Sequence, residues 1–156
     1  MPNEPAGEIR PARPQDAATI RSLVRAARLN PFGLHWQRFY VVADENGTIG
    51  GCVQLKEHRR WHKQAVRELA SLVVRPSWRG QGLGAALVRH LQRQAGPPLW
   101  LMCRSRLVTF YERSGFGEVV DRSEMPPAFA ILQAGFDLAR LGRRNSEYLA
   151  IMVWRG

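Results

Sequence analysis

A glycine-rich turn between an apolar strand and an amphipathic helix constrains the fold of this chain more than any other feature. The run VRELASLVV at 66–74 predicts a central strand, and RPSWRGQGLGAAL follows it directly. Leucines at i+4 spacing then predict a helix that continues to Gln94. Glycines at 80, 82 and 84 let main-chain N–H groups approach a ligand, and the first turn of a helix attracts anions. The segment therefore predicts a phosphate-binding turn; a glycine-rich connection without a ligand is the alternative.

The remaining expected elements alternate between strands and helices. Strands are expected at 8–13, 39–43, 48–57, 99–103, 116–120 and 148–154, and helices at 17–29, 107–113 and 126–142. Residues 33–38 form either a loop or a short helix, and Gly50-Gly51 indicates a bulge or the close approach of another segment. This order predicts an α/β fold with a mixed sheet, in a single domain over 8–156 that follows a disordered N-terminus at 1–7.

The net charge of +10, from 23 Lys and Arg against 13 Asp and Glu, favours an anionic partner. Nucleic acid, a membrane surface and a phosphorylated cofactor all meet this condition. The basic residues are spread along the chain and form no long block, which disfavours nucleic acid. All of them except Lys56 and Lys63 are arginine, a bias typical of GC-rich bacterial genomes.

Other composition features predict a cytoplasmic protein that does not associate with membranes. No apolar run reaches the roughly 18 residues of a membrane-spanning helix, and the N-terminus lacks the apolar core of a secretory signal. Cys52 and Cys103 lie in apolar, strand-like contexts and lack the spacing of a disulfide framework or a metal site. We interpret both as buried, reduced thiols.

Neither common nucleotide motif fits the glycine-rich turn. The dinucleotide fingerprint needs a tight turn directly after the strand and an acidic residue about 20 positions later. Here 75–79 intervenes and 99–111 contains no Asp or Glu. A Walker A loop requires Gly-Lys-Ser/Thr, which the turn lacks.

Two segments resemble the motifs of the GNAT N-acetyltransferase superfamily. The segment VVRPSWRGQGLG resembles its first motif, Arg/Gln-x-x-Gly-x-Gly/Ala after an apolar strand, with Arg79, Gly82 and Gly84 at the defined positions. The segment TFYERSGF at 109–116 resembles its second motif, Phe-Tyr-x-x-x-Gly-Phe. The resemblance covers nearly the whole chain and implies a mixed central sheet, splayed at the cofactor site, with helices on both faces.

The resemblance also implies acetyl-CoA as cosubstrate and no metal. Leu72, Val73 and Val74 would offer main-chain groups to the pantetheine arm and the thioester. The residues that would hold the pyrophosphate are Arg79, Gly80, Gln81, Gly82, Leu83, Gly84 and Ala85. Since CoA carries several negative charges, this cofactor would account for part of the positive net charge.

Two residues are implied as catalytic. Tyr111 matches the tyrosine that often protonates the departing CoA thiolate; packing beneath the cofactor is the alternative role. Glu68 lies where many members carry a catalytic glutamate, and strand periodicity places it on one face with Ala70, Leu72 and Val74. The alternative for Glu68 is an ion pair with Arg67 or another arginine.

The chain departs from the family pattern at two places. Arg104 stands where members often have asparagine, seven residues before Tyr111. The connection Met125–Gly142 is longer than usual, and its apolar helix would pack either on the acceptor side of the cleft or against a second subunit of a homodimer. His58 and His62 have i, i+4 spacing, but a polar loop without a third ligand disfavours a metal site.

The leading hypothesis is an acetyl-CoA-dependent N-acetyltransferase in which a primary amine attacks the thioester directly. The amine acceptor is a small molecule or a protein lysine or N-terminus, because the sequence carries no acceptor motif. A noncatalytic acyl-CoA-binding or regulatory module is the second hypothesis. A basic nucleic-acid-binding domain is the third, and the absence of a nucleic-acid-reading motif weighs against it.

Overall fold

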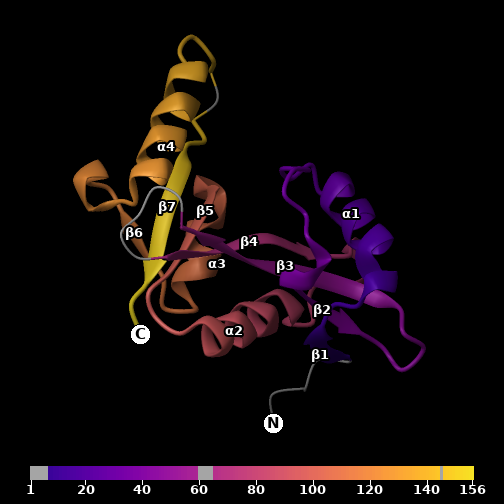
Figure 1. The fold of residues 1–156 in the computed structure, drawn as a ribbon. Coiled ribbons are helices and arrows are strands. Elements are labelled where there is room, and N and C mark those ends of the chain that lie inside the picture. The colour runs from indigo at the N-terminus through magenta and orange to yellow at the C-terminus, as the bar shows by residue number, and fades with distance from the viewer. Residues whose placement is uncertain (1–6, 60–64, 145) are drawn as a thin grey trace. The chain divides into compact units, whose positions relative to one another are not determined.

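The computed structural model describes residues 7–59, 65–144 and 146–156, and within them the chain has an α/β fold (Figure 1). The strands are β1 (Glu8–Pro11), β2 (Phe39–Ala43), β3 (Ile49–His58), β4 (Val66–Val74), β5 (Leu99–Arg104), β6 (Gly117–Val119) and β7 (Leu149–Trp154). The helices are α1 (Ala17–Ala26), α2 (Leu83–Ala95), α3 (Val108–Glu112) and α4 (Pro127–Ala139). The strands form one mixed sheet in the order β1-β2-β3-β4-β5-β7-β6. The predicted fold class is confirmed.

The chain divides into two compact units that share β3 and β4. The first unit comprises Met1–Lys56 and Leu69–Gln94, and the second comprises Glu57–Glu68 and Ala95–Gly156. Apart from Gly7, the segment 1–7 predicted to be disordered lies outside the described residues. The single domain over 8–156 stays a prediction.

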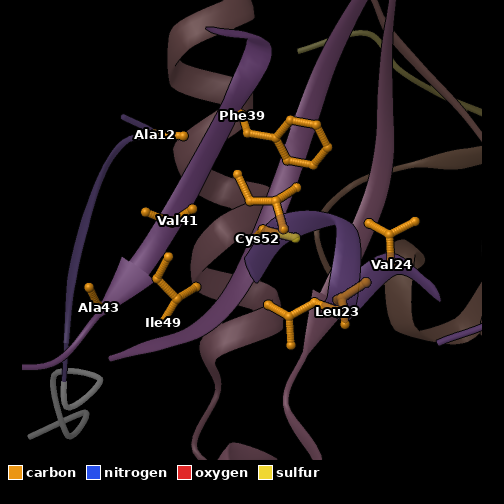
Figure 2. Close-up of a cluster of buried hydrophobic side chains, with 10 residues drawn as sticks. Ala12, Leu23, Val24, Phe39, Val41, Ala43, Ile49 and Cys52 are labelled. Atoms are coloured by element: carbon orange, nitrogen blue, oxygen red, sulfur yellow. The ribbon is translucent and has the colours of Figure 1, made fainter. Parts of the chain in front are cut away.

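In the first unit, helices cover both faces of an antiparallel sheet. Residues of α1, including Leu23 and Val24, share a buried cluster with Val41 and Cys52, which face each other across β2 and β3 (Figure 2). The opposite face meets α2, because a side chain built at Gly51 would lie 3.3 Å from Leu87 Cδ1. Alternation along β2 and β3 therefore gives each helix its own face of the sheet.

Gly50 and Gly51 mark both a bulge and a close approach, as their sequence predicted. Val42 pairs with Gly51 and Ala43 with Ile49, so Gly50 is the extra residue. A Cβ at Gly50 would lie 1.8 Å from the Trp78 ring, and one at Gly51 would lie 2.8 Å from the carbonyl oxygen of Val73. Only glycine leaves room for these contacts.

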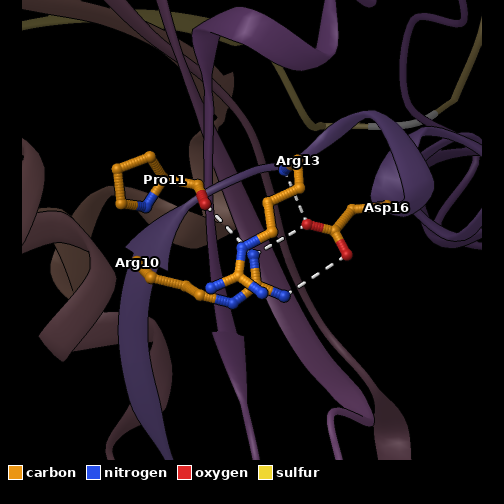
Figure 3. A network of polar contacts seen from close by, with 4 residues as sticks. All are labelled: Arg10, Pro11, Arg13 and Asp16. Atoms are coloured by element: carbon orange, nitrogen blue, oxygen red, sulfur yellow. Dashed lines mark hydrogen bonds and ion pairs between the residues drawn. The ribbon is translucent and has the colours of Figure 1, made fainter.

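A network around Asp16 fixes the entry into α1 (Figure 3). Arg10 donates from Nη1 to Asp16 Oδ2 at 2.8 Å and from Nη2 to Oδ1 at 3.3 Å, and the Arg13 N–H donates to Oδ2 at 2.7 Å. The Arg10 guanidinium is the main cause that lowers the pKa of Asp16. The pair is nearly buried, with 16% of the Arg10 and 7% of the Asp16 side chain exposed.

Helix α1 ends at Ala26, three residues before the expected end at Leu29. Arg28 adopts a left-handed conformation with φ 55°, and the Leu29 N–H donates to the Val24 carbonyl at 3.1 Å. This bond spans five residues and is typical of a Schellman ending. Sequence periodicity missed it because the left-handed position is usually glycine.

In the second unit, β7 pairs antiparallel with both β5 and β6, and α4 runs alongside β7 (Figure 1). Phe129 of α4 is 1% exposed and packs in one cluster with Trp100, Ile151 and Val153. Its ring meets Trp100 edge to face at 6.2 Å. The helix expected at 126–142 is thus present and anchored through this face, although it ends at Ala139.

Candidate functional site

The glycine-rich turn requires glycine at two positions for reasons of backbone conformation. Gly80 has φ +80° and Gly82 has φ +75°, which side chains of L-residues rarely permit. A Cβ built at either position meets nothing within 4 Å. The strain of a substitution therefore comes from the backbone, while the space beside the turn is open to a ligand.

Contacts with β3 hold the residues that precede these glycines. The Arg75 N–H donates to the Gly50 carbonyl at 2.7 Å, and the Arg75 guanidinium donates to the Ile49 carbonyl at 3.2 and 3.0 Å. Trp78 packs against the bare backbone of Gly50. These anchors were not foreseen from the sequence; the glycine pair in β3 was their only signal.

Helix α2 begins at the end of this turn and presents unpaired donors there. Its first backbone bond runs from the Ala86 N–H to the Gly82 carbonyl at 3.0 Å. The N–H groups of Leu83, Gly84 and Ala85 precede that bond, so they lack partners within the helix. No acidic residue lies in the first turn of α2. The start of α2 is therefore suited to an anion.

Arg79 adds a positive charge next to these donors. Its Nε donates to the Val74 carbonyl at 3.2 Å, at an exposed position. The Val74 carbonyl thus accepts a bond from Arg79, and the Val73 carbonyl faces Gly51. The role of the main-chain groups of Leu72, Val73 and Val74 toward the pantetheine arm stays a prediction.

Ser71 interrupts the regular alternation of β4. It has φ 53°, a left-handed conformation that is uncommon for a residue with a side chain. Its hydroxyl donates to Gln54 Oε1 at 3.3 Å, and the fully buried Gln54 donates from Nε2 to the Gly33 carbonyl at 2.8 Å. Uniform period-2 spacing therefore does not extend from Glu68 to Val74, and the shared face predicted for them needs correction.

Glu68 pairs with His58, for which the sequence indicated only a disfavoured metal site. His58 Nε2 lies 2.5 Å from Glu68 Oε2. The Glu68 side chain is 6% exposed and that of His58 is 34% exposed. Within the described residues, Glu68 is therefore paired with a histidine and not with an arginine, which was the alternative. His62 lies outside the described residues.

The pairing follows from the register of β3 and β4. Contacts join Gly50 to Arg75, Cys52 Sγ to the Ser71 carbonyl and His58 to Glu68. Residue numbers thus rise along β3 where they fall along β4. The two strands therefore run antiparallel. The sequence could have indicated this pair only if the register across the connection had been known.

Tyr111 lies on α3 within an aromatic group. It is 6% exposed, and its ring meets Phe110 at 4.9 Å and Phe116 at 5.9 Å, both edge to face. Burial, with a smaller contribution from Cys103, raises the pKa of Tyr111 well above its ordinary value. The hydroxyl therefore keeps its proton at neutral pH.

Arg104, which replaces the common asparagine, belongs to a charged group on the second unit. Arg104 Nη1 lies 3.3 Å from Glu147 Oε2 and Arg106 Nε lies 3.1 Å from Glu147 Oε1. The Arg104 guanidinium also lies 5.9 Å from the centre of the Phe136 ring. Arg104 thus links the end of β5 to α4 and to the segment before β7.

One face of α4 is exposed and apolar. Its large exposed apolar residues are Ile131, Leu132 and Leu138, and Leu141 follows the helix. The predicted packing is therefore found on the Phe129 face alone. Packing of the other face on an acceptor or a second subunit stays a prediction.

Both cysteines are buried and free, as predicted. Burial raises the pKa of each thiol to about 12, and Glu118 contributes at Cys103. Among the described residues, no group of three or more His, Cys, Asp or Glu side chains is arranged to hold a metal. No helix in the same part of the chain has the length and apolar character needed to cross a membrane.

Comparison with known structures shows which proteins share this fold. The structure matches the N-acetylglutamate synthase of Neisseria gonorrhoeae, complexed with coenzyme A and N-acetyl-glutamate, with a TM-score of 0.73 and 22% identity over 98% of this chain. This chain covers 36% of that one, about a third of its length. Rv2747 of Mycobacterium tuberculosis, in complex with CoA, matches with a TM-score of 0.68 and 22% identity over 96% of this chain and 99% of the other.

A histone acetyltransferase HPA2-related structure from Corynebacterium glutamicum matches with a TM-score of 0.62 and 20% identity, over 97% of both chains. At such identities these likenesses establish the fold alone. The family model for the acetyltransferase (GNAT) domain matches residues 35–118, more than half of the chain. That segment contains the glycine-rich turn, Glu68, His58 and Tyr111. The chain belongs to the GNAT acetyltransferase family.

Proposed function

We propose that this protein is an acetyl-CoA-dependent N-acetyltransferase that transfers an acetyl group to a primary amine by direct attack on the thioester. The observation that carries the proposal is the left-handed glycine turn at the start of α2, where free N–H groups and Arg79 meet open space. Family membership supports the same chemistry, and the structures that share the fold include CoA complexes.

The residues of the turn fit the pyrophosphate of CoA. Gly80 and Gly82 leave open the space that a Cβ would fill, and the N–H groups of Leu83, Gly84 and Ala85 are suited to phosphate oxygens. Gln81 lies between the two glycines and would offer its own N–H. When bound, acetyl-CoA supplies an acyl group activated as a thioester. We assign Leu72, Val73 and Val74 to the pantetheine arm.

Proton transfer is assigned to the second unit. A primary alkylamine has a pKa of about 10.4 and is protonated at neutral pH, so it must lose a proton before it can attack. We assign Glu68, which lies four residues before Leu72 on the same strand, to the removal of this proton. Tyr111 keeps its proton at neutral pH and would donate it to the thiolate as the C–S bond breaks, although its raised pKa makes it a weaker acid than an exposed tyrosine. A thiolate is already a tolerable leaving group, so this donation would help modestly.

The acceptor is proposed as a small-molecule amine or a protein lysine or N-terminus. The synthase of Neisseria gonorrhoeae holds N-acetyl-glutamate, and the NatC complex, which matches with a TM-score of 0.66 and 17% identity over 96% of this chain and 98% of the other, holds a peptide. An acetylated amino acid and a peptide are thus both found bound to proteins that share this fold. An acceptor panel must therefore include both.

The test combines cofactor binding with turnover. The melting temperature is measured with and without CoA, and release of the CoA thiol from acetyl-CoA is followed with amino acids, polyamines and peptides as acceptors, with mass spectrometry of the products. We expect a raised melting temperature and at least one N-acetylated product. Binding without any product would favour the noncatalytic acyl-CoA-binding module. Neither binding nor product would contradict both.

A further inference from the structure

In the pair formed by His58 and Glu68, the carboxylate is buried and the imidazole is partly exposed. Glu68 Oε2 lies 2.5 Å from His58 Nε2, and the Glu68 side chain is 6% exposed. His58 is 34% exposed, so a ligand from solution reaches the imidazole far more readily than the carboxylate. A proton-accepting group must come within hydrogen-bond distance of the proton that it removes. The exposed member of the pair meets this requirement better.

Neighbouring groups hold the imidazole in one orientation. The Phe129 ring of α4 meets the His58 ring edge to face, with centroids 5.7 Å apart and an angle of 88°. On the same strand, Glu57 is occupied by Arg59, whose Nη2 lies 2.9 Å from Glu57 Oε2. Within the described residues, the charged group bonded to the imidazole is thus Glu68, and the aromatic group packed on it is Phe129.

The hydrogen bond determines which nitrogen is basic. A carboxylate can only accept hydrogen bonds, so with Glu68 ionised His58 Nε2 carries the proton and donates it to Oε2. In the neutral imidazole the other nitrogen, Nδ1, then has the free lone pair. Fixing one ring nitrogen by a buried acid is a recognised way to make the other a proton acceptor.

We propose that His58 takes the proton of the acceptor amine at Nδ1, and that Glu68 is a positioning residue that acts through His58 Nε2. This proposal rests on the proposed N-acetyltransferase function. The amine proton passes to Nδ1, and the nitrogen lone pair forms the bond to the thioester carbonyl carbon. The C–S bond then breaks, and its electron pair leaves with the thiolate, which receives the proton of Tyr111. The second proton of the attacking nitrogen is lost as the amide forms and restores the Tyr111 hydroxyl. The imidazolium is stabilised by the Glu68 carboxylate until it releases its proton to solvent.

Kinetics of matched variants separate this assignment from direct proton removal by Glu68. The variants are His58→Ala, His58→Gln and Glu68→Gln, with Glu57→Gln as the control that removes a nearby carboxylate outside the pair. Each is assayed with the amine accepted by the wild type, and its fold is checked by the shift in melting temperature that CoA produces.

We expect His58→Ala and His58→Gln to lower kcat by about 100-fold or more, the usual range for loss of an acid–base group. Added imidazole should restore at least part of the activity of His58→Ala and none of that of Glu68→Gln. Glu57→Gln should match the wild type. If His58→Ala keeps its kcat within about twofold of the wild type while Glu68→Gln is impaired, Glu68 acts directly and the proposal is wrong.

Nitrogen NMR of the imidazole provides a readout that does not depend on turnover. We expect the neutral wild-type His58 ring to carry its proton on Nε2, and this preference to weaken in Glu68→Gln. A neutral ring protonated on Nδ1 in the wild type would overturn the proposal whatever the kinetics. If the wild type acetylates no amine, the proposed function and the catalytic role of His58 both fail, whereas impaired Glu68→Gln with unimpaired His58→Ala rejects the role of His58 alone.

Discussion

The glycine-rich turn of the first unit and the His58–Glu68 pair of the second unit use different parts of the chain. The turn relies on main-chain groups, because its left-handed glycines and the start of α2 leave N–H donors exposed. The pair relies on side chains from two strands that meet at 2.5 Å. Changes in the turn should therefore alter cofactor binding, whereas changes in the pair should alter proton transfer.

The glycine-rich turn and the residues assigned to proton transfer also differ in burial. The carboxylate of Glu68 and the ring of Tyr111 are nearly buried. The turn is open, and its positive charge comes from Arg79 and from the start of α2. Binding of a multiply charged cofactor needs an accessible surface, whereas in the pair only the imidazole of His58 is accessible and the carboxylate behind it is buried.

The largest effect is expected for Glu68→Gln. The variant should lose about 10²–10⁴-fold in turnover near neutral pH, because His58 no longer has the carboxylate that orients its imidazole to take the amine proton. As the pH rises toward the amine's own pKa of about 10.4, solution supplies neutral amine and the rate should recover. A pH profile of kcat together with the CoA dissociation constant checks this. A uniform loss at every pH with weakened CoA binding would show that Glu68 has a structural role.

The next effect concerns Gly82→Val in the turn. At CoA concentrations of about 100 times the dissociation constant, the wild type should gain about 2.7 kcal/mol, or roughly 5–11 °C in melting temperature. The variant should lose this shift, because valine is strained at φ +75° and fills the space beside the turn.

Gly47→Val is the matched control for Gly82→Val. Gly47 has φ +80° and, like Gly82, would place its Cβ within 4 Å of nothing, but it lies in the turn between β2 and β3. The control should be destabilised by a similar backbone strain and keep the CoA-induced shift. If CoA shifted the melting temperature of both variants equally, the glycine-rich turn would not be part of the cofactor site.

A smaller effect is expected for Asp16→Asn, which lies in the first unit outside the turn. At neutral pH it should lower the free energy of unfolding by about 1.5–3 kcal/mol, the range for a hydrogen-bonded charged group. Because the folded state lowers the pKa of Asp16, its stabilisation is present above the unfolded value of about 3.9 and is lost as the pH falls through the lower folded value.

Urea unfolding at several pH values measures this difference between wild type and Asp16→Asn. The gap should close in acid, while the CoA-induced shift and the kcat at neutral pH stay as in the wild type. A gap that is constant across pH would mean that the carboxylate charge is not what stabilises the entry to α1.

The smallest effect is expected for Tyr111→Phe. The variant should lose about tenfold or less in kcat, because a thiol with a pKa of about 8.5 leaves readily without a proton. Its affinity for CoA should change less than its turnover, since the hydroxyl matters chiefly as the thiolate departs. Steady-state kinetics and a binding titration compare the two. An unchanged kcat at every pH would leave Tyr111 a packing residue between Phe110 and Phe116.

The sequence alone predicted the features that depend on one residue and its immediate neighbours. A glycine at a position of positive φ, such as Gly82, can be recognised in the sequence, because this backbone conformation strongly favours glycine. The α/β order of elements follows in the same way from periodicity along each segment. The ends of α1 and α4 were placed too late, because left-handed Arg28 and the termination of α4 at Ala139 follow no apolar pattern.

The tertiary structure decided which distant residues meet. His58 is bonded to Glu68 because β3 and β4 pair in one antiparallel register, and Trp78 covers Gly50 because a bulge displaces that residue. The left-handed Ser71 changes the facing of β4, which no count along the strand could show. Such contacts depend on the register between paired strands, and the length of the segment that connects two strands does not determine that register. A shift of one residue in register turns every side chain to the opposite face, and for that reason only the folded chain could assign Glu68 its partner.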